Sequence, residues 1–410
     1  MTRYGYLRKY ASDGTWSPST PTETIRQAQT AISAIRNNHD VSITMLESVI
    51  SLTYHPISLM ELLGDPGLIR DCILYLCQRE KEGVQVFDDE QGYLYFRILL
   101  LAINISVISD FDCPAFWNVL GSKDGKEDAS QMLSRGVEVF IAQRAGDHPD
   151  QLLDWDLPTP GEPIISQRYA LLLLGLLFKD RKGLLRVCSE TRSPTLTGVL
   201  FVLWRLVHIT GTPTLWTYFI DIAKRNYLVA GDNVTPIQIF EEDARAHSQI
   251  WHSRNASIAV DLEDARTQLL LLTKKMHFEP ARGPSAVSFS MLAPSLILYF
   301  SPNSKVGFIS GVEDLFLPLI QELFAGFWRY LEIGDNPIFV PPEVFVNHFG
   351  AIMLINNCMI QHLIDHPPIA AGVTSKEALQ ATVDLGVIEL MSQSIILIDD
   401  YNGEEVGGKK

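Results

Sequence analysis

The chain has 410 residues, of which 47% are hydrophobic and 20% are charged, and its formal net charge is −15 at pH 7. At about 100–200 residues per domain, this length predicts two or three units, or one continuous helical array. The acidic balance argues against a nucleic-acid partner held by its phosphates and against a broad anionic membrane surface. We therefore expect no nucleic-acid and no membrane partner, whereas a basic protein or peptide fits the charge.

The cysteines and the first residues bear on the compartment. The cysteines are odd in number and scattered without CxxC spacing, which predicts neither a disulfide framework nor a zinc site: Cys72, Cys77, Cys113, Cys188 and Cys358. Met1 to Tyr10 contains basic residues but no apolar run, so it is not a secretory signal. The glycosylation triplets at Asn104, Asn233 and Asn255 are then chance matches. The sequence predicts an intracellular protein, cytoplasmic or nuclear.

Helix starts are marked by an oxygen-bearing side chain followed by proline. Such a side chain caps an orphan amide, and proline at the next position loses no hydrogen bond there. This pair occurs at Thr20-Pro21, Asp65-Pro66, Ser193-Pro194, Thr212-Pro213 and Thr235-Pro236. Thr374 with Glu377 forms a capping box without the proline. Together these pairs predict many separate helices.

Apolar residues recur at helical spacing along most of the chain. In chain order, this periodicity predicts helices over or around Thr22–Arg36, Ile43–Leu52, Ile69–Leu76, Tyr93–Ser109, Leu133–Phe140, Ile164–Lys179, Thr195–Ile209, Leu215–Asn226, Leu262–Met276, Leu315–Leu331 and Lys376–Ile398. Strand-type alternation is confined to the short candidates Val84–Phe87 and Ile338–Val340. The sequence therefore predicts an all-α fold.

Some of these helices are apolar almost all round, namely Ile98–Ile108, Ala170–Phe178 and Val199–Val207. Helices of this kind must be covered on both sides, which predicts an inner layer. The uncharged stretches Gly283–Ser304 and Val344–Ile364 contain proline or several polar residues, so we expect buried helices there rather than membrane spans.

The punctuation of the chain predicts its organisation. We expect residues 1–20 and 400–410 to be disordered, because neither segment can bury much. The Pro-, Gly- and Asp-rich segment 146–163 is the expected linker between an N-terminal helical array, 21–145, and a C-terminal array, 164–399.

In three places an apolar helix end leads through a short polar turn into an apolar helix: Glu61–Leu76, Asn118–Leu133 and Leu184–Trp204. This form resembles the junction between helices of an armadillo or HEAT repeat. The resemblance implies an irregular α-solenoid of stacked, armadillo-like helices. Because the spacings are unequal, a non-repeating multi-helix bundle is the alternative.

Two candidate partner-binding sites emerge. Inner helices of peptide-binding armadillo proteins present a Trp with an Asn four positions later, and Trp251 and Asn255 have this spacing. The other reading is a buried Trp and an exposed helix-terminal Asn. Asp154, Trp155 and Asp156 belong to an acidic patch around an aromatic residue, which can dock a basic segment or be a solvated linker.

Signatures for catalysis, cofactors and metals are weak. Gly125-Lys126-Glu127 lacks the hydroxyl of a phosphate loop, and His362 and His366 lack the Glu that metalloprotease chemistry requires. Asp88-Asp89-Glu90 lacks the further carboxylate of a magnesium-diphosphate site. We expect no catalytic residue, cofactor or metal, and a scaffold that binds a protein or peptide on a concave helical surface. The alternative is an all-α enzyme or small-ligand binder with a pocket between apolar inner helices.

Overall fold

The computed structural model describes residues 4–11, 21–109, 129–147, 164–191, 196–229, 259–276 and 311–332, and between 350 and 389 residues 350, 353, 356, 357, 359–365, 374–387 and 389. Every regular element in these ranges is a helix, which confirms the all-α class. The chain divides into two compact units, Met1–Trp251 and His252–Lys410. The expected division at 146–163 instead falls inside unit 1, because helices that precede and follow it pack together.

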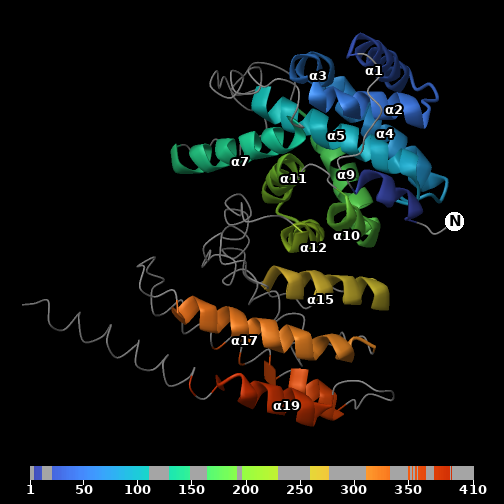
Figure 1. Cartoon of the computed structure of the whole chain (residues 1–410). Coiled ribbons are helices and arrows are strands. Elements are labelled where there is room, and N and C mark those ends of the chain that lie inside the picture. Colours follow the sequence, from blue (N-terminus) through green and yellow to red (C-terminus); the bar gives the residue numbers. More distant parts are fainter. Residues whose placement is uncertain are drawn as a thin grey trace, which may run out of the picture. The chain divides into compact units, whose positions relative to one another are not determined.

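Unit 1 contains a short 3₁₀ helix near the N-terminus and a succession of α-helices (Figure 1). Its elements are η1 Gly5–Tyr10, α1 Pro21–Arg36, α2 Ile43–Ile50, η2 Ser51–Tyr54, α3 Pro56–Leu63, α4 Pro66–Lys81, α5 Glu90–Ser109, α7 Ala129–Asp147, α9 Gln167–Lys179, α10 Arg181–Glu190, α11 Thr197–Thr210 and α12 Pro213–Val229. Three of these, α1, α4 and α12, begin at the proline of a predicted pair. At α4, the Asp65 carboxylate accepts a hydrogen bond of 2.8 Å from the amide of Gly67, as a cap should.

Helix α5 forms the centre of unit 1. All its side chains from Gly92 to Ile108 are buried, and it packs against α2, α4, α7 and α11. Of the described helices, α5 alone is long and apolar enough to cross a membrane, and 94% of that apolar stretch is buried inside the protein. The Asn104 side chain is fully buried here, so its glycosylation triplet is inaccessible. The expectation of an inner layer therefore holds for α5.

The other apolar helices of unit 1 differ from one another. Helix α11 is buried from Thr197 to Val207 and packs against α5, α7, α9 and α12. Helix α9 packs against α4, α11 and α12, yet Leu171 and Leu172 stay 46% and 36% exposed. Thus one side of α9 stays exposed at Leu171 and Leu172, although Ala170–Phe178 is apolar almost all round.

In unit 2, the described elements are α15 Leu262–Met276, η4 Glu313–Leu315, α17 Phe316–Glu332 and α19 Ser375–Asp384. Helix α17 packs against both α15 and α19 (Figure 1). The Arg266 guanidinium of α15 donates to both carboxylate oxygens of Asp314 in η4, at 2.6 and 2.7 Å. Helix α19 starts with the predicted capping box of Thr374 and Glu377.

Two local expectations differ from the structure. Val84–Phe87 is not a strand but part of the turn between α4 and α5, where Gly83 adopts a φ of +84°. The N-terminal segment expected to be disordered contains η1, with Leu7 and Tyr10 buried. Tyr4, which precedes η1, and Leu7 and Tyr10 within it are buried and repeat every three positions, the period of a 3₁₀ helix. Residues 148–163 and 400–410 lie outside the described residues.

Candidate functional site

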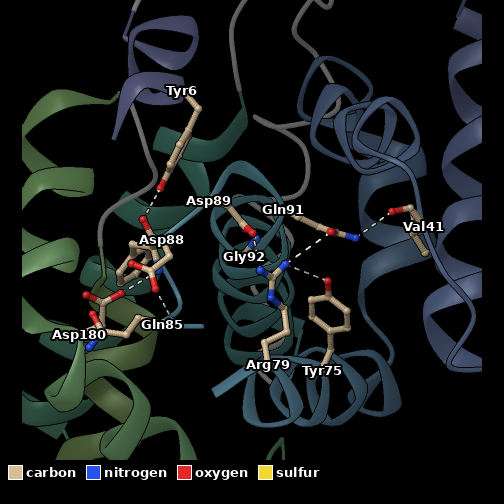
Figure 2. Close-up of polar contacts among 11 residues, drawn as sticks. Tyr6, Val41, Tyr75, Arg79, Gln85, Asp88, Asp89, Gln91, Gly92 and Asp180 are labelled. Carbon is tan, nitrogen blue, oxygen red and sulfur yellow. Dashed lines mark hydrogen bonds and ion pairs between the residues drawn. The ribbon is translucent and has the colours of Figure 1, made fainter. Parts of the chain in front are cut away.

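A cluster of polar contacts surrounds the connection between α4 and α5, residues 82–89 (Figure 2). Helix α4 ends because Gly83 takes the left-handed conformation, and the amide of Val84 turns back to the carbonyl of Arg79 at 3.0 Å. Within the turn, the Asp88 carboxylate accepts from the amide of Gln85 at 2.7 Å. These contacts fix the backbone between the two helices.

The start of α5 is held by Asp89. One carboxylate oxygen accepts from the amide of Gly92 at 3.0 Å, and the other pairs with the guanidinium of Arg79 on α4. Arg79 also donates to the Tyr75 hydroxyl at 3.3 Å (Figure 2). A Cβ on Gly92 would lie 2.1 Å from the carbonyl oxygen of Val86, so the turn returns too closely for any other residue.

The same connection is tied to two distant segments through the backbone of Phe87. Its amide donates to the Asp180 carboxylate between α9 and α10 at 2.8 Å, and its carbonyl accepts from the Tyr6 hydroxyl of η1 at 3.0 Å. Burial, and next the neighbouring Tyr93, raise the pKa of Tyr6, so its hydroxyl stays a neutral donor. A Cβ on Gly183 would lie 2.6 Å from an Asp180 oxygen, which makes this approach depend on glycine as well.

A second buried cluster lies near the first. Asp221 on α12 pairs with Arg225 at 3.1 Å and with Arg181 of α10 at 3.2 Å, and Arg225 donates to the carbonyl of Arg181 at 3.3 Å. Burying these charges is tolerable because each is paired and hydrogen-bonded. The cluster joins α10 to α12, and α10 begins directly after Asp180, which contacts the first cluster.

These clusters hold segments of the chain in position. Their carboxylates accept from backbone amides and guanidinium groups, and none activates a described nucleophile. Burial raises the pKa of the Cys72 thiol and raises that of Cys188 to about 12, so both thiols are protonated and unreactive near neutral pH. The arrangement fixes the positions of four segments relative to one another: η1, the connection 82–89, the junction of α9 with α10, and α12.

Five residues were predicted from the sequence to bind a partner. Trp251, Asn255, Asp154, Trp155 and Asp156 all lie outside the described residues.

The predicted histidine pair is described in part. His362 is 5% exposed and faces inward, with its Nε2 atom 3.7 Å from a Glu313 oxygen and its ring beside Phe316. Asp365 is exposed and accepts from Gln361, and His366 is outside the described part. Over the described ranges, no group of three or more His, Cys, Asp or Glu residues is placed to hold a metal ion.

The residues of the first cluster carried only partial signals in the sequence. Asp88 and Asp89 precede an apolar helix and have the chemistry of caps, and Tyr75 and Arg79 have helical i, i+4 spacing. Asp180 lies 93 residues from Phe87, and no local pattern links them.

No family model, no curated protein and no solved structure matches the chain.

Proposed function

We propose that this chain is a non-enzymatic, intracellular scaffold that binds another protein or a peptide on a face of its stacked helices. The expected concave face of an irregular, armadillo-like array is part of this proposal. Two features support it: the polar clusters hold loops in place, and the helices form layers around α5. Helix α4 packs against α9, with which it is not adjacent in the chain, and this favours an irregular stack over a regular one.

The exposed apolar face of α9 carries the proposal. Leu171 and Leu172 are 46% and 36% exposed, and a Cβ placed on the neighbouring Gly175 would meet nothing within 4 Å. Leu74 on the adjacent helix α4 is 42% exposed. Single exposed leucines are common on soluble proteins, but several on adjoining helices mark a surface that another protein covers.

From the relative direction of the two helices, we infer that these leucines share one surface. Lys179 at the end of α9 pairs with Glu80 at the end of α4 at 2.5 Å, so the C-terminal ends of the two packed helices meet. Leu74 and Leu172 therefore lie at similar distances from those ends. The resulting apolar surface, defined by Leu74, Leu171 and Leu172 around Gly175, is called the α9 face below.

One observation bears on the alternative, a small-ligand site between apolar inner helices. Asn104 of α5 is fully buried beside α11 and neither polar atom of its amide has a hydrogen-bond partner, which is the kind of group that a ligand can satisfy. However, a Cβ on Gly198 of α11 would lie 2.3 Å from the Asn104 amide oxygen. The helices are thus too close at this point to admit a ligand.

The test is affinity purification of the tagged full chain after chemical crosslinking in cells, with quantitative mass spectrometry. We expect a stoichiometric protein partner whose recovery falls at least tenfold (about 1.4 kcal/mol) in the double variant L171D/L172D. The control is I57D, which places a charge on a more exposed apolar residue of α3, where Ile57 is 67% exposed. Absence of a stoichiometric partner, or full recovery with L171D/L172D, would contradict the proposal.

A further inference from the structure

Helix η1 is attached to unit 1 in the manner of a bound peptide. It has only six residues, and no side chain caps its N-terminus. Such a short 3₁₀ helix has little stability of its own, so its contacts with the rest of the protein must hold it in place. Those contacts are long-range: its hydroxyl and ammonium groups reach residues 37 to 81 positions away in sequence.

The surface beneath η1 is built by four segments and is called the η1 site below. Tyr93 of α5 receives the rings of Tyr6 and Tyr10, with ring centroids 5.6 and 4.9 Å apart. Arg186 of α10 lies 4.8 Å from the ring centre of Tyr4. The carbonyl of Phe87 accepts from Tyr6 (Figure 2). The η1 site thus recognises aromatic side chains at fixed positions.

Two carboxylates complete the η1 site. Glu47 of α2 and Glu90 of α5 both lie near the ammonium of Lys9, at 2.5 and 2.8 Å. The Tyr10 hydroxyl is within hydrogen-bond distance of the same two groups, at 3.0 Å from Glu47 and 2.5 Å from Glu90. Two neighbouring carboxylates repel each other, and a cation between them relieves that repulsion.

The protonation states of Lys9 and Tyr10 suit their contacts with the two carboxylates. Although burial acts to lower the pKa of Lys9, its hydrogen bonds to Glu47 and Glu90 raise the pKa above its usual value. Burial, followed by the hydrogen bond to Glu90, raises the pKa of Tyr10. Lys9 is therefore a cation and Tyr10 a neutral donor across the physiological range. The site is complementary to a segment that carries a basic residue directly before a tyrosine.

We propose that the η1 site is a peptide-binding surface for a partner protein, and that η1 occupies it as a ligand supplied in cis. The partner segment would be basic and rich in tyrosine, with the pattern Tyr-x-Tyr-Leu-x-Lys-Tyr that Tyr4–Tyr10 displays. Charge complementarity supports this occupant, because the site offers two carboxylates on a chain whose net charge is −15. The proposal does not rest on the α9 face and can fail or hold independently of it.

Because η1 already occupies the η1 site, it lowers the apparent affinity of the site for a partner peptide. The tether from Ala11 to the start of α1 at Pro21 is short, so η1 competes at a high effective concentration. A partner peptide must therefore bind much better once η1 is weakened. Leu7 is fully buried and belongs to η1 rather than to the site, so L7D weakens the ligand and leaves the site intact.

The test uses the full chain and a fluorescent peptide with the sequence of residues 1–11, with binding measured by fluorescence anisotropy. We expect the L7D chain to bind this peptide at least tenfold more tightly than the unaltered chain does. A scrambled peptide of the same composition should bind at least tenfold more weakly. In the L7D background, E47Q/E90Q should also reduce binding at least tenfold, because the pair then no longer holds Lys9.

Several results would overturn the proposal. Equal binding by the L7D and unaltered chains, or by the scrambled peptide, would show that the site does not recognise the segment. Loss of helical circular dichroism in L7D would show that η1 is an integral part of the core. A concentration-dependent dimer of the unaltered chain that the peptide dissociates would identify the occupant as a second copy instead. None of these results involves Leu171 or Leu172, so they leave the scaffold proposal to its own test.

Discussion

The polar groups at the two ends of α5 differ in whether they have hydrogen-bond partners. At the N-terminal end, Asp89 caps the helix and pairs with Arg79, and Glu90 meets Lys9 and Tyr10. In the C-terminal half, Asn104 is fully buried and neither atom of its side-chain amide has a hydrogen-bond partner.

This contrast separates two ways in which α5 contributes to unit 1. A paired buried group adds modest stability and fixes distant segments, whereas an unpaired one costs about 1–3 kcal/mol. The N-terminal end therefore specifies where loops and η1 lie. The C-terminal half relies on close apolar packing, as the approach of Gly198 shows. The predictions below alter each end in turn.

The largest effect is expected for G92A. The new methyl group would lie 2.1 Å from the carbonyl oxygen of Val86, so the turn must move and its hydrogen bonds with it. We expect a loss of about 3 kcal/mol in the free energy of unfolding, at the upper end for overpacking. The measurement is the urea concentration at the midpoint of the unfolding transition of unit 1, monitored by circular dichroism.

Gly175 provides the matched control. It lies inside α9 and a Cβ there meets nothing within 4 Å, so G175A should leave stability unchanged or raise it by up to about 1 kcal/mol. Similar losses in G92A and G175A would mean that helical glycines in this protein respond alike, and the special closeness of the 82–89 turn would be refuted.

The next effect concerns Asp180, which accepts from the buried amide of Phe87. D180A leaves that amide without its acceptor and should cost about 2 kcal/mol. D180N keeps an acceptor oxygen in place and should recover about half of the loss. Hydrogen exchange of the Phe87 amide, resolved by NMR, should accelerate in D180A more than in D180N. Equal exchange in the two variants would argue against this contact as the anchor of the turn.

The sequence predicted helices well because their signals are local. Pro21, Pro66 and Pro213 each begin a helix as expected, since a cap and a proline act within one turn. The Asp180–Phe87 contact spans 93 residues and depends on the packed fold. Likewise, the domain boundary was expected at 146–163 because that segment has a linker's composition, yet contacts between α4 and α9 unite the helices on either side.

The N-terminal segment shows a different reason for a missed feature. Tyr4, Leu7 and Tyr10 recur every three residues, but the segment is too short and too basic to predict a helix from its pattern alone. Its order comes from Glu47 and Tyr93, which no pattern within the first residues could reveal. The exposure of Leu171 on α9 was missed because an all-apolar helix gives no sign of which face is covered.

At the other end of α5, N104L tests the cost of the unpaired amide. Leucine has nearly the same shape and needs no hydrogen bond, so we expect a gain of about 1 kcal/mol in the free energy of unfolding. N104D, which buries a charge of similar size, should instead destabilise the protein. Calorimetric melting temperatures check both. A loss of stability in N104L would contradict the expected cost of the unpaired amide.

The smallest effect is expected for D89N, which separates the two roles of Asp89. Asparagine still accepts from the amide of Gly92 but no longer carries the charge that pairs with Arg79. Because the Asp89 side chain is 45% exposed, this ion pair is screened by solvent and its loss should cost less than about 0.5 kcal/mol. D89A loses the cap as well and should cost about 1 kcal/mol.

Urea unfolding at low and high salt distinguishes these contributions. The difference between D89A and D89N should persist at high salt, because a hydrogen bond to a backbone amide is little affected by ionic screening, whereas the small cost of D89N should shrink. If D89N proved as damaging as D89A, the ion pair with Arg79 rather than the cap would hold the start of α5. The paired end of the helix would then depend on charge, and its stability would fall as salt rises.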